Sequence, residues 1–156
     1  MYNGLLHLHS LLRWVIFILL IIAIIKHYKG MTTKSGYSAG DRKVDLFLMI
    51  SAHVTLLVGL YQWFAGPWGL KLIQDKGFSE VMKNSTERFF AVEHMVGMIV
   101  AIILITVGRS AGKPSNAGGA QHRKAFMMFL IALIILLVAV PWPFRENLGR
   151  GWFPGM

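Results

Sequence analysis

Four long apolar runs constrain what this chain can fold into more than any other feature of its sequence. Each run has about 18 to 22 residues, and at ~1.5 Å per residue a helix of that length crosses the ~30 Å hydrocarbon core of a bilayer. A water-soluble bundle would need polar outer faces, whereas stretches such as FLIALIILLVAV have none. We therefore predict four membrane-spanning helices at about residues 5–25, 44–65, 89–108 and 125–142.

The residues outside these runs are too few to form a soluble domain of ordinary size. The chain has 156 residues, and the four runs take up just over half of it. We therefore expect residues 1–156 to form a single membrane domain, an all-α integral membrane up-and-down four-helix bundle. An outer loop at 66–88 and a C-terminal tail at 143–156 complete this expected arrangement.

The outer loop carries helix signals of its own. Pro67 follows Gly66 and is expected to stop the second helix. Residues 70–83 could form a short helix on the membrane surface, and Asn84 and Ser85 offer N-caps for the third span.

Basic residues gather on one side of the predicted membrane. The formal net charge is +9, but the charges sit in loops and at span ends and accompany no nucleic-acid-binding motif, so we expect no nucleic-acid partner. The loops at 26–43 and 109–124 hold nine Lys and Arg residues, against six in the outer loop and the tail. The positive-inside rule then places both termini outside the cytoplasm, which for a bacterial inner membrane is the periplasm.

The absence of cysteine removes several kinds of chemistry. Disulfides, iron–sulfur clusters, covalently attached c-type haem and Cys nucleophiles are excluded. The sequence shows no catalytic motif either, and it leaves open whether the protein is an enzyme.

Histidines in or beside the apolar runs are the strongest functional signal. An ionisable side chain in a span is costly, so it usually has a partner and a role. His9 and His94 each lie roughly 6 to 8 Å below the same membrane face, and the first and third helices of an up-and-down bundle sit diagonally. We therefore predict that these two imidazoles ligate one haem iron.

Arg13 lies one helical turn from His9 on the same face and needs an anion inside the apolar run. A haem propionate would serve, and so would Glu93. This favours His9 over His7, which points to another side of the helix and is expected to face the lipid headgroups.

His53 and His122 are candidate ligands of a second haem. They lie on the second and fourth helices, which form the other diagonal, but ideal helices leave them mismatched by around 10 Å along the membrane normal. The alternatives are a buried neutral His53 that hydrogen-bonds a carbonyl and a His122 that faces headgroups. His27, in the basic stretch KHYK, is expected to be a solvated loop residue.

With one such histidine per span (His9, His53, His94 and His122), the chain resembles the small four-helix membrane cytochromes b. The resemblance covers the four spans but neither the loops nor the tail. It implies low-spin b haem, held by paired histidines, that passes electrons between quinol and a redox partner at the membrane surface. The stretches GLYQW and FFAVEHMVG more distantly resemble one half of a haem A synthase, but the Glu–His spacing departs from that family's form, so no catalytic role is carried over.

Three functions are open on the sequence. The first is a b-type haem protein, free-standing or a subunit of a respiratory complex, that exchanges electrons with quinone or a periplasmic electron carrier. The second is a non-redox accessory transmembrane subunit of a larger membrane complex. The third is a transporter or proton-conducting subunit that uses Arg13, Glu93 and His53 as a relay, although four unbroken spans leave little room for an alternating-access site. All three place the chain in a lipid bilayer.

Overall fold

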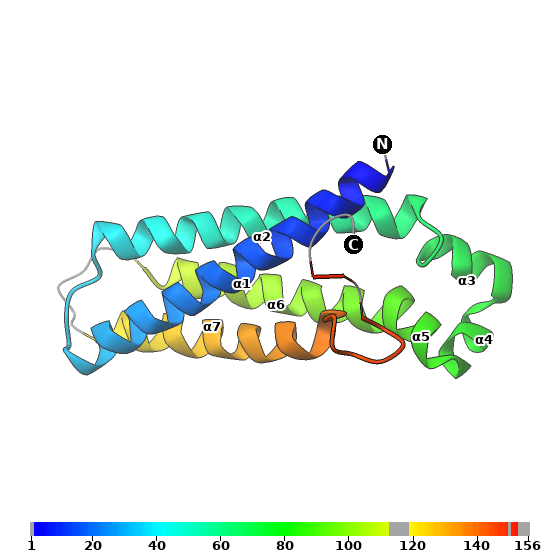
Figure 1. The fold of residues 1–156 in the computed structure, drawn as a ribbon. Helices are drawn as coiled ribbons and strands as arrows, with labels where there is room; N and C mark the ends of the chain where they lie inside the picture. Colours follow the sequence, from blue (N-terminus) through cyan, green and yellow to red (C-terminus); the bar gives the residue numbers. More distant parts are fainter. Residues whose placement is uncertain (1, 113–118, 150, 153–156) are drawn as a thin grey trace.

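The computed structural model describes all residues except 1, 113–118, 150 and 153–156, and its described part is all-α (Figure 1). The four long helices are α1 (Tyr2–Thr32), α2 (Ala39–Ala65), α6 (His94–Ser110) and α7 (Ala120–Ala139). Shorter elements join α2 to α6, namely α3 (Leu70–Lys76), α4 (Phe78–Lys83), α5 (Ser85–Arg88) and a π-helical turn, η1 (Phe89–Glu93). The predicted all-α, up-and-down four-helix bundle is confirmed.

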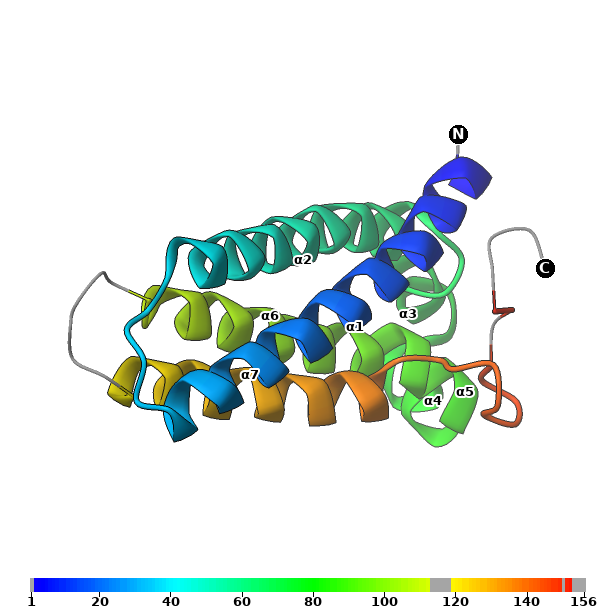
Figure 2. The ribbon, with the colours of Figure 1, turned by 60° about the vertical axis from the view of Figure 1, so that its left-hand side comes forward.

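The four long helices pack in the cyclic order α1, α2, α6, α7. The pairs α1 with α6 and α2 with α7 are therefore the diagonals of the bundle, as predicted. Helix α1 crosses the other three at an inclined angle, which is visible in Figures 1 and 2. The start of α1, the short helices α3 to α5 and the end of α7 lie at the same end of the bundle (Figure 1).

The side chains divide into a tightly packed interior and an apolar exterior. Leu20, Leu48 and Phe129 are completely buried, whereas Leu57 and Val138 are 68% and 66% exposed. Large apolar side chains cover the outside of every long helix, which suits lipid and not water. All four helices are long and apolar enough to cross a membrane, and the chain is an integral membrane protein with four spans.

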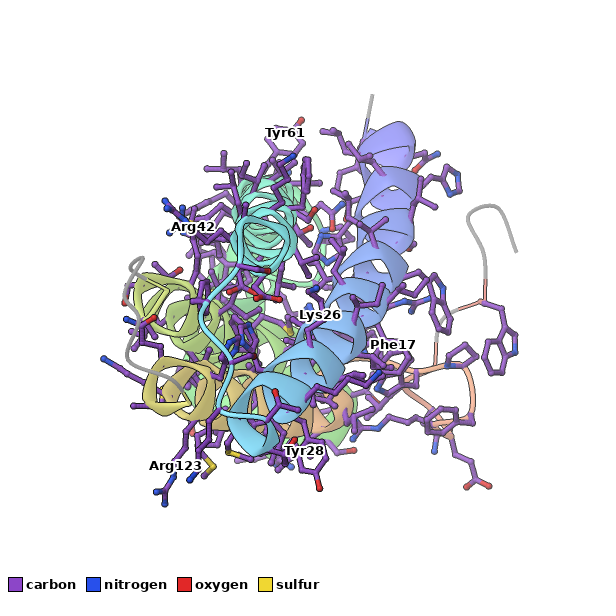
Figure 3. The ribbon with its side chains drawn as sticks, turned by 90° about the vertical axis from the view of Figure 1, so that its left-hand side faces the viewer. Phe17, Lys26, Tyr28, Arg42, Tyr61 and Arg123 are labelled. Carbon is purple, nitrogen blue, oxygen red and sulfur yellow. The ribbon has the colours of Figure 1, made fainter. Side chains whose placement is uncertain are left out.

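Charged side chains lie at the ends of the bundle. Figure 3 views the bundle from the end that contains Lys26, and Arg42 and Arg123 point outward there. We call this the inner end, because the basic loops predicted to face the cytoplasm lie here, and the opposite end the outer end. These names describe the molecule and carry no assignment of orientation in the membrane.

Helix α1 is longer than its apolar run, and this corrects one prediction. The run ends at residue 25, but the helix continues to Thr32, because hydropathy marks the end of the apolar run and not the end of the helix. His27 therefore lies inside the helix and has no exposed surface, so its prediction as a solvated loop residue is wrong. Helix α2 then begins at a capping box, in which Ser38 and Asp41 each satisfy the other's backbone N–H group.

The segment between α2 and α6 follows its sequence signals. Helix α2 ends at Ala65, directly before Gly66 and Pro67, as predicted. The predicted surface helix is present as α3 and α4, which Gly77 separates with a positive φ of 84°. Asn84 is the N-cap that starts the third span, since its Oδ1 accepts the backbone N–H groups of Thr86 and Glu87.

Close packing between α6 and α7 depends on a glycine, and this can be tested. A Cβ atom at Gly108 would lie 2.5 Å from the ring of Phe129, which is fully buried and has no room to move. We expect Gly108→Ala to destabilise the fold by about 1–3 kcal/mol, the usual cost of overpacking a core. Thermal unfolding in detergent, followed by circular dichroism, measures this loss.

Gly4 is the matched control, because a Cβ atom there would meet nothing within 4 Å. Gly4→Ala should leave the unfolding temperature unchanged or raise it slightly, since alanine favours helix over glycine. Equal effects of the two substitutions would contradict the packing described here.

Candidate functional site

The structure brings His9 of α1 and His94 of α6 together across the diagonal of the bundle. Their ring centroids lie 6.2 Å apart and their ring planes are inclined at 72°. Both side chains are half-buried near the outer end of the bundle. Two imidazoles from opposite helices thus face a common space.

His94 is held in one tautomer by helix α7. Its Nδ1 lies 2.6 Å from the carbonyl oxygen of Ala139, and a carbonyl can only accept, so Nδ1 carries the proton and donates it. In the neutral ring Nε2 is then the unprotonated nitrogen, which is the form in which an imidazole nitrogen can bind a metal. Gly97 permits this approach, since a Cβ atom there would lie 2.7 Å from Cβ of Ala139.

His9 is accommodated by a glycine on helix α2. A Cβ atom at Gly59 would lie 3.1 Å from Cε1 of His9, so a larger residue would press on the imidazole. Beside it, Gln62 donates from its Nε2 to the carbonyl of Leu5, at 2.9 Å, and ties the outer ends of α1 and α2 together. The position of His9 therefore depends on close packing of these two helices.

A π-helical turn directly precedes His94. The turn η1 joins α5 to α6, and the indole N–H of Trp63 donates to the carbonyl of Ala91 within it, at 2.8 Å. A π turn inserts one extra residue and so rotates the following side chains by about 100° relative to an unbroken α-helix. Such turns are frequent at functional sites. The sequence FFAVEH contains no proline or glycine that would predict this one.

A cavity adjoins the two imidazoles. Its volume is about 140 Å³, which is below the ~300–1,000 Å³ typical of ligand pockets. Apolar side chains make up most of its walls. Residues that bear on its chemistry are His9, Arg13, Gly59, Trp63, Phe90 and His94.

Arg13 lines the cavity and is 8% exposed. Its Nη2 donates to the carbonyl oxygens of Gly151 and Trp152 in the C-terminal tail, at 3.2 and 3.3 Å. Its guanidinium carbon also lies 5.3 Å from the ring centroid of Trp14. The sequence made Glu93 a candidate anionic partner of Arg13. In the structure the carboxylate of Glu93 pairs with Nε of Arg88 instead, at 2.6 Å.

His53 and His122, the predicted second pair of ligands, lie in different surroundings. His53 is exposed on α2, where its Nδ1 donates to the carbonyl of Met49 at 2.8 Å. His122 is 1% exposed and contacts His27 of the neighbouring helix α1. The alternative of a headgroup-facing His122 is therefore wrong, and the structure does not bring His53 and His122 to one site. His7 is exposed on α1 near the outer end, where headgroups were expected.

His122 belongs to a buried polar cluster at the inner end of the bundle, which we call the inner cluster. Its members are His27 of α1, Asp45 of α2, His122 of α7 and Tyr37 of the loop between α1 and α2. Nδ1 of His27 lies 2.8 Å from Nδ1 of His122, and Nε2 of His27 lies 3.0 and 3.1 Å from the two carboxylate oxygens of Asp45. Tyr37 donates its hydroxyl to the same carboxylate.

The inner cluster is closed off from solvent. His27, Asp45 and His122 are at most 1% exposed, and the ring of Tyr37 stacks against both imidazoles. Gly30 lies so close to His122 that a Cβ atom would come within 2.5 Å of its ring. The sequence analysis missed this cluster, although a carboxylate inside the apolar run VDLFLM was a signal that a partner must exist.

Among the described residues, no group of three or more His, Asp or Glu side chains is arranged to hold a metal ion. In comparisons with known proteins, the chain matches no family model, and no curated protein and no solved structure is significantly similar to it.

The contribution of the inner cluster to the stability of the fold can be tested by substitution. Replacing Asp45 with alanine leaves a buried imidazole pair without its carboxylate, and breaking a buried charged pair costs about 3–5 kcal/mol. We expect Asp45→Ala to lower the unfolding temperature by far more than Ser38→Ala, which removes one helix cap worth about 1 kcal/mol. A smaller loss for Asp45→Ala than for Ser38→Ala in the same detergent would contradict this ranking.

Proposed function

We propose that this chain is a membrane-embedded b-type haem protein that transfers electrons between quinol or quinone and a redox partner. The observation that carries the proposal is the 6.2 Å separation of the His9 and His94 rings beside a mostly apolar cavity. The two residues come from helices that are diagonal in the bundle, so they offer ligands from opposite sides.

The separation matches what two ligands of one metal require. The 6.2 Å between the ring centroids brings both imidazoles close enough that they would together hold the iron of one haem. The donor set and the spacing therefore fit haem. Gly59 keeps the backbone of α2 close to His9 at the cavity, and Gly97 lets α6 approach α7 so that His94 reaches the carbonyl of Ala139.

The residues around the cavity have distinct tasks in this proposal. His94 presents Nε2, and the hydrogen bond from its Nδ1 to Ala139 fixes the ring and raises its basicity. His9 supplies the opposing imidazole. Arg13, at the edge of the cavity, is a cation that would pair with the haem carboxylates, while the backbone of the C-terminal tail fixes its position.

Haem held by two histidines would supply one-electron chemistry. The mostly apolar walls of the cavity would strengthen the effect of each charge near it. This combination favours electron transfer over binding of oxygen or a substrate at the iron.

The position of the cavity suggests on which side of the membrane electrons would be exchanged. Its lining includes Tyr2 and Leu6 at the start of α1, and the positive-inside rule assigns that end to the outer face of a bacterial inner membrane. Quinone in the outer leaflet and a periplasmic carrier are partners that could reach it. The protein would work alone or as a subunit of a respiratory complex.

Visible absorption of the purified protein tests the proposal. We expect a reduced-minus-oxidised spectrum of b type, and His9→Ala and His94→Ala should each reduce bound haem to background. His53→Ala and His7→Ala are the matched controls, since both side chains are exposed and their loss should leave the spectrum unchanged.

Circular dichroism of each variant shows whether the helices persist, so that loss of haem is distinguished from loss of fold. Full haem content in folded His94→Ala would contradict the assignment. A wild-type protein that folds without haem would favour the alternative, a non-redox accessory transmembrane subunit.

A further inference from the structure

The inner cluster contains more hydrogen bonds than two neutral histidines can supply with protons. Four ring nitrogens belong to His27 and His122, and a neutral imidazole carries one proton. The two neutral rings would therefore contribute two protons. The geometry contains three bonds that each need one.

The three bonds can be followed along the cluster. Nε2 of His27 faces the carboxylate of Asp45, and the two Nδ1 atoms face each other at 2.8 Å, where one must donate and the other accept. Nε2 of His122 faces the carbonyl oxygen of Gly36 at 3.4 Å, and a carbonyl only accepts. Each contact requires one proton, so the pair together with Asp45 holds three.

The third proton has two positions that satisfy every contact. In one, the pair is an imidazole and an imidazolium, and Asp45 is a carboxylate. In the other, the proton has moved from Nε2 of His27 to Oδ1 of Asp45, and both rings are neutral. The two arrangements differ only in the place of one proton along a single hydrogen bond, and the cluster is electrically neutral in both.

The hydroxyl of Tyr37 keeps its own proton and does not contribute to this count. Burial, together with the hydrogen bond to Asp45, raises the pKa of Tyr37 well above its usual range. Tyr37 therefore donates to Asp45 and stabilises negative charge on it. The loop that carries Tyr37 and Gly36 covers the cluster at the inner end.

Other charged groups around the cluster are an ion pair, one arginine and two exposed basic residues. Asp41 on α2 pairs with Lys26 of α1 at 3.0 Å, and Arg109 of α6 acts on Tyr37 through its positive charge. From α7, the ring of Phe129 packs on His27, and Arg123 and Lys124 are exposed. Asp45 is thus the acidic group in direct contact with the imidazole pair.

We propose that the inner cluster is a buried proton-binding site, in which His27 and His122 share one proton whose charge is balanced by Asp45. In a lipid-surrounded interior an unbalanced charge is costly, so proton and carboxylate are expected to be kept together. The site lies eighteen residues along α1 from His9, which is about 27 Å at ~1.5 Å per residue. It is therefore separate from the cavity and independent of the haem proposal.

Nuclear magnetic resonance of the full chain in lipid nanodiscs counts these protons directly. With histidine labelled by nitrogen-15 and aspartate by carbon-13, His27→Gln, His122→Gln and Asp45→Asn assign the signals of each residue. In the wild-type protein at neutral pH we expect three protons in total over the four ring nitrogens and the Asp45 carboxyl. Two ring protons beside an ionised Asp45 would overturn the proposal.

Asp45→Asn adds a second, independent readout, because the amide removes the negative charge but keeps a similar shape. The imidazole pair should then lose its extra proton and hold two. The matched control is Asp41→Asn, which changes a neighbouring buried carboxylate on the same helix and should leave three protons. A folded Asp45→Asn protein that still holds an imidazolium would also overturn the proposal. If Asp45→Asn does not fold, the number of protons counted in the wild-type protein decides whether the proposal stands.

Discussion

A bilayer offers no water to a buried polar group, and this constraint explains where the polar side chains of the bundle lie. Between the two ends, the interior consists of packed aliphatic and aromatic side chains such as Leu20, Leu48 and Phe129. Polar groups in the interior are concentrated near the ends, and most of them bond other parts of the chain, although Nε of Arg109 is buried without a hydrogen-bond partner among the described residues. At the inner end the partners are side chains of three helices and a loop, and at the outer end they include carbonyls of α7 and of the tail.

The inner and outer ends of the bundle accommodate their buried polar side chains in different ways. At the inner end, glycines at positions 30 and 112 let imidazole and phenol rings fill the space completely, so the polar groups bond one another. At the outer end, the π turn and the close approach of α6 to α7 turn His94 toward a cavity that remains open. A filled cluster stabilises the helix arrangement, whereas the outer end keeps a cavity of about 140 Å³ beside two imidazoles.

The fold followed from the sequence because apolar runs of membrane length leave few alternatives. The equal depth of His9 and His94 could be derived from residue counts alone, since both lie close to the same span ends. The burial of His27 could not, because hydropathy marks where the apolar run stops and not where helix α1 ends. The partner of His122 was missed because it comes from an adjacent helix and not from the diagonal one, which only packing decides. The contact of Arg13 with the tail joins positions 138 residues apart through irregular backbone, for which the sequence offers no periodic signal.

The angle between the two imidazole planes offers the most direct test of the proposal that His9 and His94 hold a haem. Low-temperature electron paramagnetic resonance of the oxidised protein reports how the axial ligands of a ferric haem are oriented. Rings of His9 and His94 held at 72° predict a highly anisotropic low-spin signal, because nearly perpendicular ligand planes leave two iron orbitals almost equal in energy. A high-spin ferric signal, or the rhombic low-spin signal of parallel ligand planes, would contradict the site described here.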